Sequence, residues 1–343
     1  MRFIITLGTP RRSWKSNIPM RSSTLSNSKK IIAAILCCVV GLVIWRALFL
    51  PVVAPGVWTW KKLAFDLPPS IEVYEGQSRG EQNELFRAWR VEIDYSDETL
   101  QARALLSSDP SGRETTSAMA QKVKALVAVN GGYFDMQGSP AKTYSLVLRD
   151  GTILSPSVER VRRGSQQFFV TRSAFGIRED RTFDIAWVGN KNGKTYAFDA
   201  PILKPMKNGD SLAEQYSRAH LWDAQEAIGA GPRLIQNGKI HITFDEELFP
   251  GSGFERDVNY PRCAVGYTAQ NKIILFVTGY KRGENYVGLT LPQLAKTLRE
   301  LGCVEAMNLD GGGSETLVVN GALLNRPPDG TLRAVTSIFA IVR

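Results

Sequence analysis

A glycine-rich stretch near the C-terminus combines a carboxylate with backbone that could bind an anion. Asp310 follows an apolar run at residues 304–309 and precedes a short loop made of Gly311, Gly312, Gly313 and Ser314. Glycine allows unusual backbone angles and lets N–H groups approach a ligand closely, as in anion-binding nests. We therefore predict that Asp310 performs acid or base catalysis on a negatively charged substrate. The alternative is a tight hairpin that serves only the fold.

A second acidic residue also lies beside glycines. Asp135 comes shortly after Asn130, Gly131 and Gly132, which end a short apolar run. Two carboxylates on either side of a glycosidic bond are the usual equipment for glycoside hydrolysis, so Asp135 and Asp310 are predicted to act together. Such a pair could instead bind Ca²⁺ or Mg²⁺. Asn130 and the two glycines are predicted to contact the substrate, with the alternative that Asn130 only holds a turn.

Two arginines and one more carboxylate complete the candidate site. Arg233 follows a Gly-x-Gly-Pro turn, and Arg262 begins a predicted strand after Pro261. Guanidinium groups suit bidentate binding of a phosphate or carboxylate, so both arginines are predicted to bind the substrate. The alternative is that each is structural. Glu315 is a third acidic candidate, unless it lies on the solvent face of the next strand.

Other common catalytic equipment is scarce in this sequence. There are two histidines and no Cys-x-x-Cys pair, which weakens the case for a histidine-based zinc site or a Ser-His-Asp triad. No phosphate-binding P-loop or dinucleotide motif is present. No cofactor is therefore predicted, and no metal site is assigned. Cys263 and Cys303 could form a disulfide in an oxidising compartment or remain buried thiols.

The elements that must position these residues are mostly strands. Alternating apolar and polar residues at 86–95 and 100–107 are typical of half-buried strands, and most connections have hairpin length. One helix is strongly indicated, because Thr290 and Gln293 form a capping box before a leucine stripe that ends at Gly302. We predict an α+β domain with a large, mainly antiparallel mixed β-sheet and a few packed helices.

Charge and hydropathy set the N-terminus apart. The net charge is +9, but ten Lys and Arg residues and no acidic residue precede Asp66. The excess of positive charge therefore belongs to a basic tail, and a nucleic-acid partner is not predicted. The apolar stretch that begins at Ile31 is long enough to span a bilayer. We predict a transmembrane signal anchor with a cytoplasmic basic tail and a periplasmic or extracellular body; a cleaved signal peptide is the alternative.

These predictions divide the chain into four parts. Residues 1–30 are the basic cytoplasmic tail, and residues 31–50 are the transmembrane signal anchor. Residues 51–70 are rich in proline and are interpreted as a linker. Residues 71–343 form the globular domain that carries the candidate site.

Several of these stretches, in this order, resemble the phosphodiester glycosidase family. The resemblance covers residues 127–343 and rests on the segments Asn130-Gly131-Gly132-Tyr133-Phe134, Gly229-Ala230-Gly231-Pro232-Arg233-Leu234, Pro261-Arg262-Cys263-Ala264-Val265-Gly266, the predicted helix Leu291–Gly302, Asn308-Leu309-Asp310-Gly311-Gly312-Gly313-Ser314 and the terminal Arg333-Ala334-Val335. This sequence departs from the family pattern at Cys263, where a small hydroxyl residue is common, and at Glu315, where a small residue is common.

The resemblance implies an enzyme that cleaves between an anomeric carbon and a phosphate oxygen. Its substrate would be a glycan or glycolipid phosphodiester of the cell envelope. Arg233, Arg262 and the glycine amides would bind the phosphate, and Asp310 would act with Asp135 or Glu315. A non-catalytic module that binds an anionic polysaccharide during exopolysaccharide assembly or export is the alternative.

Overall fold

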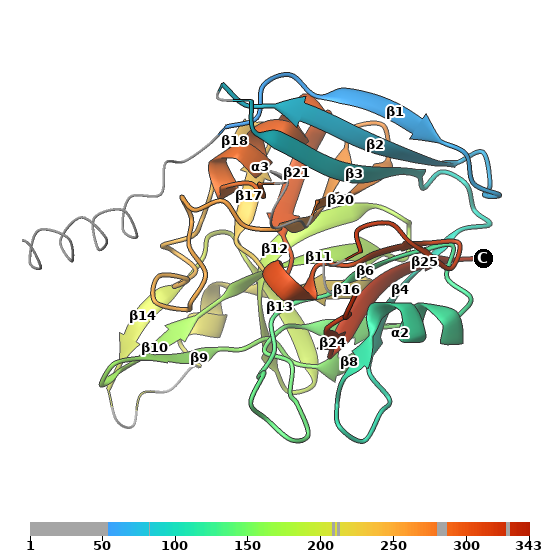
Figure 1. Cartoon of the computed structure of the whole chain (residues 1–343). Coiled ribbons are helices and arrows are strands. Elements are labelled where there is room, and N and C mark those ends of the chain that lie inside the picture. Colours follow the sequence, from blue (N-terminus) through green and yellow to red (C-terminus); the bar gives the residue numbers. More distant parts are fainter. Residues whose placement is uncertain (1–53, 82, 208–209, 211–212, 280–286, 327–329) are drawn as a thin grey trace, which may run out of the picture. The chain divides into compact units, whose positions relative to one another are not determined.

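A computed structural model of the chain describes residues 54–343 except 82, 208–209, 211–212, 280–286 and 327–329 (Figure 1). The predicted basic tail and the transmembrane anchor at 31–50 lie outside the described residues, so both stay predictions. Within the described ranges, no helix is long and apolar enough to span a membrane.

Antiparallel β-structure dominates the described chain. Its largest sheet has the order β1-β2-β3-β20-β19-β21-β17-β18, and every neighbouring pair in it is antiparallel. The strands of this sheet are β1 (Thr59–Leu63), β2 (Ile71–Arg79), β3 (Leu85–Asp94), β17 (Arg233–Gln236), β18 (Lys239–Ile240), β19 (Cys263–Thr268), β20 (Lys272–Thr278) and β21 (Cys303–Asn308).

Two more sheets pack with the first. One has the order β15-β13-β12-β11-β16-β7-β8, formed by β7 (Val147–Arg149), β8 (Thr152–Ser155), β11 (Arg172–Arg178), β12 (Phe183–Lys191), β13 (Lys194–Phe198), β15 (His220–Leu221) and β16 (Ala224–Gly229). The other has the order β23-β22-β6-β25-β4, formed by β4 (Gln101–Leu106), β6 (Val127–Asn130), β22 (Leu317–Val319), β23 (Ala322–Leu323) and β25 (Ser337–Val342).

Smaller elements complete the fold. A three-stranded sheet, β14-β10-β9, is formed by β9 (Arg160–Arg163), β10 (Gln166–Val170) and β14 (Leu203–Met206), and it lies at the lower left of Figure 1. The remaining elements are β5 (Glu114–Thr115), β24 (Ala334–Val335), the helices α2 (Thr116–Lys122) and α3 (Leu291–Glu300), and the 3₁₀ turns η1 (Gln215–Arg218) and η2 (Gly312–Ser314).

One apolar core joins the three large sheets. Val91 of β3, Phe175 of β11 and Phe339 of β25 all belong to it. Successive side chains of a strand point to opposite faces, so a strand that is covered on both sides must be apolar throughout. Strand β20 shows this pattern, because Leu275 lies in the central core and its neighbour Phe276 packs on the side of α3.

Helix α3 begins as its sequence predicts. The Thr290 hydroxyl accepts from the Gln293 amide at 3.3 Å, and the Gln293 side chain accepts from the Thr290 amide at 3.0 Å. Gly302, with φ +87°, follows the last turn in the left-handed region. The prediction of an α+β domain with mainly antiparallel strands is confirmed. The β-structure is divided among several sheets, however, and all described strand pairs are antiparallel rather than mixed.

The linker prediction does not hold for residues 59–63, which form strand β1 on β2. Trp60 explains this strand, because its ring packs on Phe276 and lies under the guanidinium of Arg90. Cys263 and Cys303 are both free and buried. Cys263 begins β19, whereas Cys303 faces Thr268 at the other end of that strand. Five residues of strand separate them by roughly 17 Å, far beyond the reach of a disulfide.

Candidate functional site

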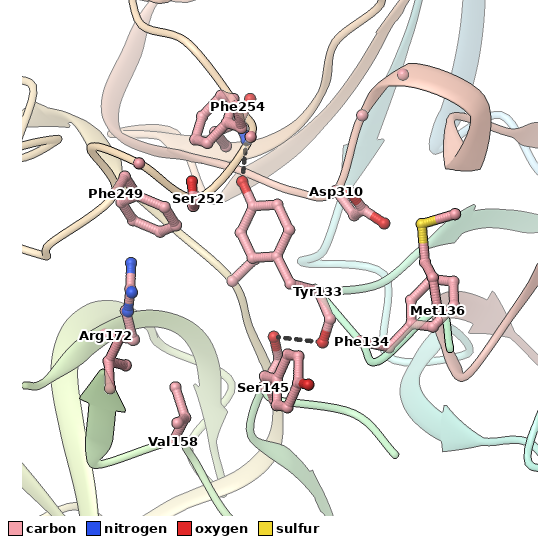
Figure 2. Close-up of a pocket in the computed structure, with 18 of the residues that line it drawn as sticks. Tyr133, Phe134, Met136, Ser145, Val158, Arg172, Phe249, Ser252, Phe254 and Asp310 are labelled. Carbon is pink, nitrogen blue, oxygen red and sulfur yellow. Dashed lines mark hydrogen bonds between the residues drawn. The ribbon is translucent and has the colours of Figure 1, made fainter. Parts of the chain in front are cut away.

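A cavity of about 800 Å³ lies where the Asp310 loop meets the β6–β7 connection, β9 and the segment at residues 249–262. Its walls combine aromatic rings with arginines, and Figure 2 shows Tyr133 between Asp310 and Arg172. The residues that line it include Tyr133, Phe134, Met136, Tyr144, Arg160, Arg162, Arg163, Arg172, Phe249, Phe254, Tyr260, Arg262, Asn308, Asp310, Gly311, Gly312 and Arg333.

Asp310 is held at the cavity wall by two neighbouring backbone segments. It follows β21 after one residue, Leu309, and its amide donates to the Gly131 carbonyl at 3.1 Å. The Asn130 side chain donates to the Asp310 carbonyl at 2.7 Å and accepts from the Thr316 amide at 3.0 Å. Asn130 is fully buried and outside the lining of the cavity. It therefore positions the loop, which is the alternative that the sequence left open.

The Asp310 carboxyl group has a pKa raised from its ordinary value to about 6. Burial is the main cause, because a low-polarity surrounding disfavours the charged form. Three weaker influences favour the charged form: the Ser314 hydroxyl, the positive charge of Arg333 and the Gly311 amide. Asp310 is therefore mostly ionised at neutral pH and becomes protonated in mildly acidic solution.

The three glycines at 311–313 mainly stabilise the conformation of the loop, and most of their amides are not free to bind an anion. The Gly311 amide interacts with the Asp310 carboxylate, and the Gly312 amide donates to the Pro261 carbonyl at 2.9 Å. Gly312 has φ +58°, a conformation that suits glycine. A Cβ at Gly313 would lie 2.3 Å from the Arg333 guanidinium, so glycine lets Arg333 approach. The predicted cradle of free amides is therefore largely corrected: two of its three N–H groups already have partners.

Gly131 and Gly132 also have structural roles. Neither lines the cavity. A Cβ at Gly131 would lie 2.3 Å from the Ser337 hydroxyl oxygen, and one at Gly132 would lie 2.1 Å from the Gly229 carbonyl oxygen. The absence of a side chain lets β6 continue closely past its neighbours, which is a packing requirement rather than a substrate contact.

Asp135 does not pair with Asp310. Its carboxylate accepts from the Gln137 amide at 2.9 Å in a local turn, and Asp135 is outside the lining of the cavity. Strand β6 ends at Asn130, so Asp135 lies in the loop between β6 and β7. Among the described lining residues, Asp310 is the one carboxylate. The described residues also contain no cluster of three or more acidic, Cys or His side chains suited to a metal ion.

Glu315 lies inside the protein and not on a solvent face. It is 1% exposed, and the Thr278 hydroxyl is 3.4 Å from both of its carboxyl oxygens. Burial raises the pKa of Glu315 well above its ordinary value. It is also absent from the lining of the cavity, so this geometry gives it no contact with a substrate.

Arg233 is the clearest correction among the predicted site residues. Its guanidinium forms a buried ion pair with Glu305, with a distance of 3.1 Å from Nε to a carboxyl oxygen, and it stacks over the Trp187 ring. Arg233 pairs in register with Met307, and Glu305 is two residues along the same face of β21. This diagonal placement brings the two charges together and turns Arg233 away from the cavity.

Arg262 lines the cavity, and its contact with a substrate stays a prediction. Its Nε donates to the Leu289 carbonyl at 2.8 Å, and its Nη2 donates to the carbonyls of Glu255 and Val258 at 2.8 and 2.9 Å. Burial lowers the pKa of Arg262 to about 10, so it stays charged at neutral pH. The side chain therefore holds the segment at residues 255–258 by hydrogen bonds and also contributes positive charge to the cavity.

Sequence reasoning missed Arg172, the most buried of the other lining arginines. It is 8% exposed, and its Nη1 has no hydrogen-bond partner among the described residues. Its guanidinium stacks on Phe249, with 3.8 Å from Cζ to the ring centroid. Burial lowers the pKa of Arg172 to about 10. The available signal was an arginine at the start of an otherwise apolar strand, β11.

A second missed arginine converges with Arg172. Arg163 and Arg172 donate to the same carbonyl oxygen, that of Leu248, at 2.9 and 3.3 Å. Leu248 has φ +54°, in the left-handed region. The Glu247 carboxylate is nearby, but donors from Ser173, Thr243, Trp187 and Arg233 surround its oxygens. The two guanidinium groups therefore share a carbonyl and have no carboxylate partner of their own within the described chain.

Aromatic rings form the other face of the cavity. Tyr133 packs beside Phe249 and Phe254, with ring centroids 5.5 and 5.9 Å apart. Its hydroxyl donates to the Gly231 carbonyl at 2.8 Å and accepts from the Asn308 side chain at 2.8 Å. A cavity with apolar walls and a few fixed polar groups is typical of a small-molecule site.

The family model of phosphodiester glycosidases matches residues 123–342, and the chain belongs to this family. The N-acetylglucosamine-1-phosphodiester alpha-N-acetylglucosaminidase of Mus musculus is 31% identical over 225 residues, which cover 63% of this chain and 36% of that protein. The Homo sapiens protein of the same name is 28% identical over the same shares. The chain thus spans about a third of the length of the curated relatives it matches.

Solved structures support the same fold. A hypothetical protein from Synechocystis has a TM-score of 0.56 at 17% identity, over 84% of this chain and 68% of that one. The zebrafish N-acetylglucosamine-1-phosphodiester alpha-N-acetylglucosaminidase catalytic domain, auto-inhibited by its pro-peptide, has a TM-score of 0.54 at 21% identity, over 84% of this chain and 89% of that one. The resemblance found in the sequence motifs is confirmed as family membership, and with it the assignment to a family of glycosidase-type hydrolases.

Proposed function

We propose that this protein hydrolyses the bond between the anomeric carbon of a sugar and a phosphodiester oxygen, and that Asp310 acts on the anomeric carbon. The observation that carries the proposal is the composition of the cavity. Asp310 is the one carboxylate among its described lining residues, and it faces a set of arginines without carboxylate partners. Membership of the phosphodiester glycosidase family supports the same reaction.

The leaving group explains why one carboxylate suffices. An ordinary glycoside releases an alkoxide, so a second carboxyl group must protonate the departing oxygen. A sugar phosphodiester releases a phosphate monoester, whose second pKa is about 6. Its oxygen can therefore leave without a proton at neutral pH. The group still required is an ionised carboxylate on the opposite side of the anomeric carbon.

Asp310 suits this role because its pKa of about 6 leaves it ionised at neutral pH. Water bonds to the anomeric carbon and gives its proton to Asp310, or Asp310 itself bonds to that carbon and water releases it later. In both courses the carbon–oxygen bond breaks, and its electron pair leaves with the phosphate. The configuration of the first sugar product, inverted or retained, distinguishes them.

Arg172 and Arg163 are the side chains that we assign to the phosphate. A buried donor without an acceptor costs about 1–3 kcal/mol, so an anion beside Arg172 would relieve an existing penalty. Figure 2 shows Tyr133 between Arg172 and Asp310, so a sugar that lies against this ring has a carboxylate on one side and a guanidinium on the other. The arrangement matches what attack opposite a leaving phosphate requires.

We propose an α-linked N-acetylglucosamine 1-phosphodiester as the sugar part, because the mouse and human relatives are named for that substrate. We also propose that the substrate is a glycan or glycolipid of the cell envelope, reached by a body anchored on the non-cytoplasmic side. The basic tail and the apolar stretch from Ile31 support this location.

The test is turnover of methyl N-acetylglucosamine 1-phosphodiester and of a nitrophenyl glycoside by the full-length protein and by Asp310→Asn. We expect release of methyl phosphate, with loss of at least about 100-fold in kcat/KM in the variant. Undiminished turnover in Asp310→Asn would move the catalytic centre elsewhere. Diester binding with no product from either protein would favour the alternative, a non-catalytic module that binds anionic polysaccharide.

A further inference from the structure

Strand β9 borders the cavity along its whole length. All four of its residues, 160–163, line the cavity, and the strand is the outer member of the sheet β14-β10-β9. Arg160 and Arg162 are exposed, whereas Arg163 is half-buried and bound to the carbonyls of Leu248 and Pro250. The strand therefore carries an inner arginine at the phosphate site and two outer arginines that reach solvent.

The cavity contains far more positive charge than one phosphodiester needs. Six arginines line it, and Asp310 is the one carboxylate in the described lining: Arg160, Arg162, Arg163, Arg172, Arg262 and Arg333. None of these arginines lies within ion-pair distance of a carboxylate in the described part of the chain. A phosphodiester has a single negative charge, so most of the positive charge would remain uncompensated when such a substrate binds.

Concentrated like charge in a hollow is costly unless a ligand of opposite charge occupies it, and it raises the local concentration of such ligands. Guanidinium groups also match phosphate and carboxylate geometry. The outer arginines lie on the same edge strand as Arg163 and are exposed, so they can contact a part of the substrate that extends beyond the buried phosphate site. A flat anionic membrane surface fits this hollow arrangement less well.

We propose that the substrate is a polyanionic glycan, in which the unit next to the cleaved bond carries its own phosphate or carboxylate and lies along β9 at Arg160 and Arg162. This inference rests on the proposed function and narrows its substrate class. The charge of the neighbouring unit, and not only the scissile phosphate, then determines which glycans bind productively.

The experiment compares four synthetic substrates of equal sugar content that share one N-acetylglucosamine 1-phosphodiester. The neighbouring sugar is neutral, phosphorylated, a uronate or a uronate methyl ester. For the full-length protein we expect kcat/KM to be about 10-fold higher when the neighbour is charged, and this preference should shrink as salt is added. A higher value for the phosphorylated or for the uronate substrate identifies the source of the second charge.

The variant is Arg160→Gln with Arg162→Gln, and the matched control is Arg218→Gln, an exposed arginine outside the cavity. We expect the preference for a charged neighbour to fall close to one in the double variant and to persist in the control. The two residues are exposed, so the variant should fold, and its Tm checks this. An equal preference in wild type and double variant would overturn the inference.

Two further measurements keep the inference separate from the proposed function. If no diester is cleaved, titration with tripolyphosphate against inorganic phosphate still tests the site: tighter binding of tripolyphosphate that the double variant loses supports it, and equal binding contradicts it. Vesicles of phosphatidylglycerol test the membrane alternative. Loss of vesicle binding in the double variant, with its substrate preference intact, would assign these arginines to a lipid surface instead.

Discussion

Asp310 and Arg333 are linked through one hydroxyl group. Arg333 Nη1 donates to the Ser314 hydroxyl oxygen at 3.3 Å, and that hydroxyl donates to the Asp310 carboxylate. Arg333 directly precedes β24 and lies 19 residues after Ser314 in the chain. The Ser314 hydrogen bond and the positive charge of Arg333 each lower the pKa of the Asp310 carboxyl group, against the larger opposing effect of burial.

The link between Asp310 and Arg333 predicts the pH dependence of activity. Asp310 must be ionised to act, so kcat/KM should rise with pH through its pKa of about 6 and then level off. Arg333→Gln removes a charge that favours the ionised form, so the rising limb should move to higher pH. A pH profile of each protein on the methyl phosphodiester measures this. Superimposable profiles would mean that the titrating group is not Asp310.

The same pKa predicts a stability effect. The folded-state pKa of Asp310 lies above its ordinary value of 3.8, so the folded state binds this proton more tightly than the unfolded state. The associated stabilisation is complete below pH of about 4 and is lost as pH rises through about 6. Asp310→Asn should therefore gain stability relative to wild type as pH rises over this window. Urea unfolding of both proteins at several pH values tests it.

Asp135 provides the matched comparison for catalysis. Asp135→Asn should retain kcat/KM within about 3-fold, because this carboxylate caps a local turn and lies outside the lining of the cavity. The measurement is steady-state turnover beside Asp310→Asn. A loss in Asp135→Asn as large as that in Asp310→Asn would restore the two-carboxylate arrangement that the sequence suggested.

Arg172 should matter more for the phosphate than for the sugar. Arg172→Gln removes a charge-assisted contact worth about 1.5–3 kcal/mol, so kcat/KM for the methyl phosphodiester should fall about 10- to 100-fold. A neutral nitrophenyl glycoside, if turned over, should lose less. Arg149→Gln, on β7 and outside the cavity, is the control. Equal losses on the charged and the neutral substrate would argue against a phosphate contact.

Arg233 should be a stability residue. Arg233→Met leaves Glu305 buried without its partner, so the free energy of unfolding should fall by about 3–5 kcal/mol. Arg233→Met combined with Glu305→Leu removes both charges and should recover much of that loss. Urea denaturation of the single and double variants measures the difference. If the double variant loses more free energy of unfolding than the two single variants lose together, an unpaired buried charge is not the cause of the loss in Arg233→Met.

Much of the local structure was readable from the sequence. The capping box before α3 and the alternation of β3 and β4 follow from side-chain chemistry that acts within a few residues. The Asp310 loop could also be identified as a candidate site, because its sequence places an acidic residue between an apolar strand and three glycines. The match to the family model also covers this loop.

The roles of individual residues depended on contacts between distant segments. Arg233 and Arg172 both start strands, yet the register of β17 against β21 gives Arg233 a carboxylate partner, whereas the Leu248 segment gives Arg172 only a carbonyl. Nothing local distinguishes them. The same applies to Glu315, which tertiary packing buries beside Thr278.

The sequence by itself determined many of the strands, the capped helix and the loop that presents Asp310, because hydrophobic period, capping and glycine conformations are properties of short segments. Only the tertiary structure decided which charges meet. Ion pairing and burial depend on which side chains come within a few ångströms, and strand pairing across many residues sets those distances. For this reason Asp135 lies outside the cavity, and Arg233 forms an ion pair with Glu305. The arginines of β9 and β11 line the same cavity as Asp310.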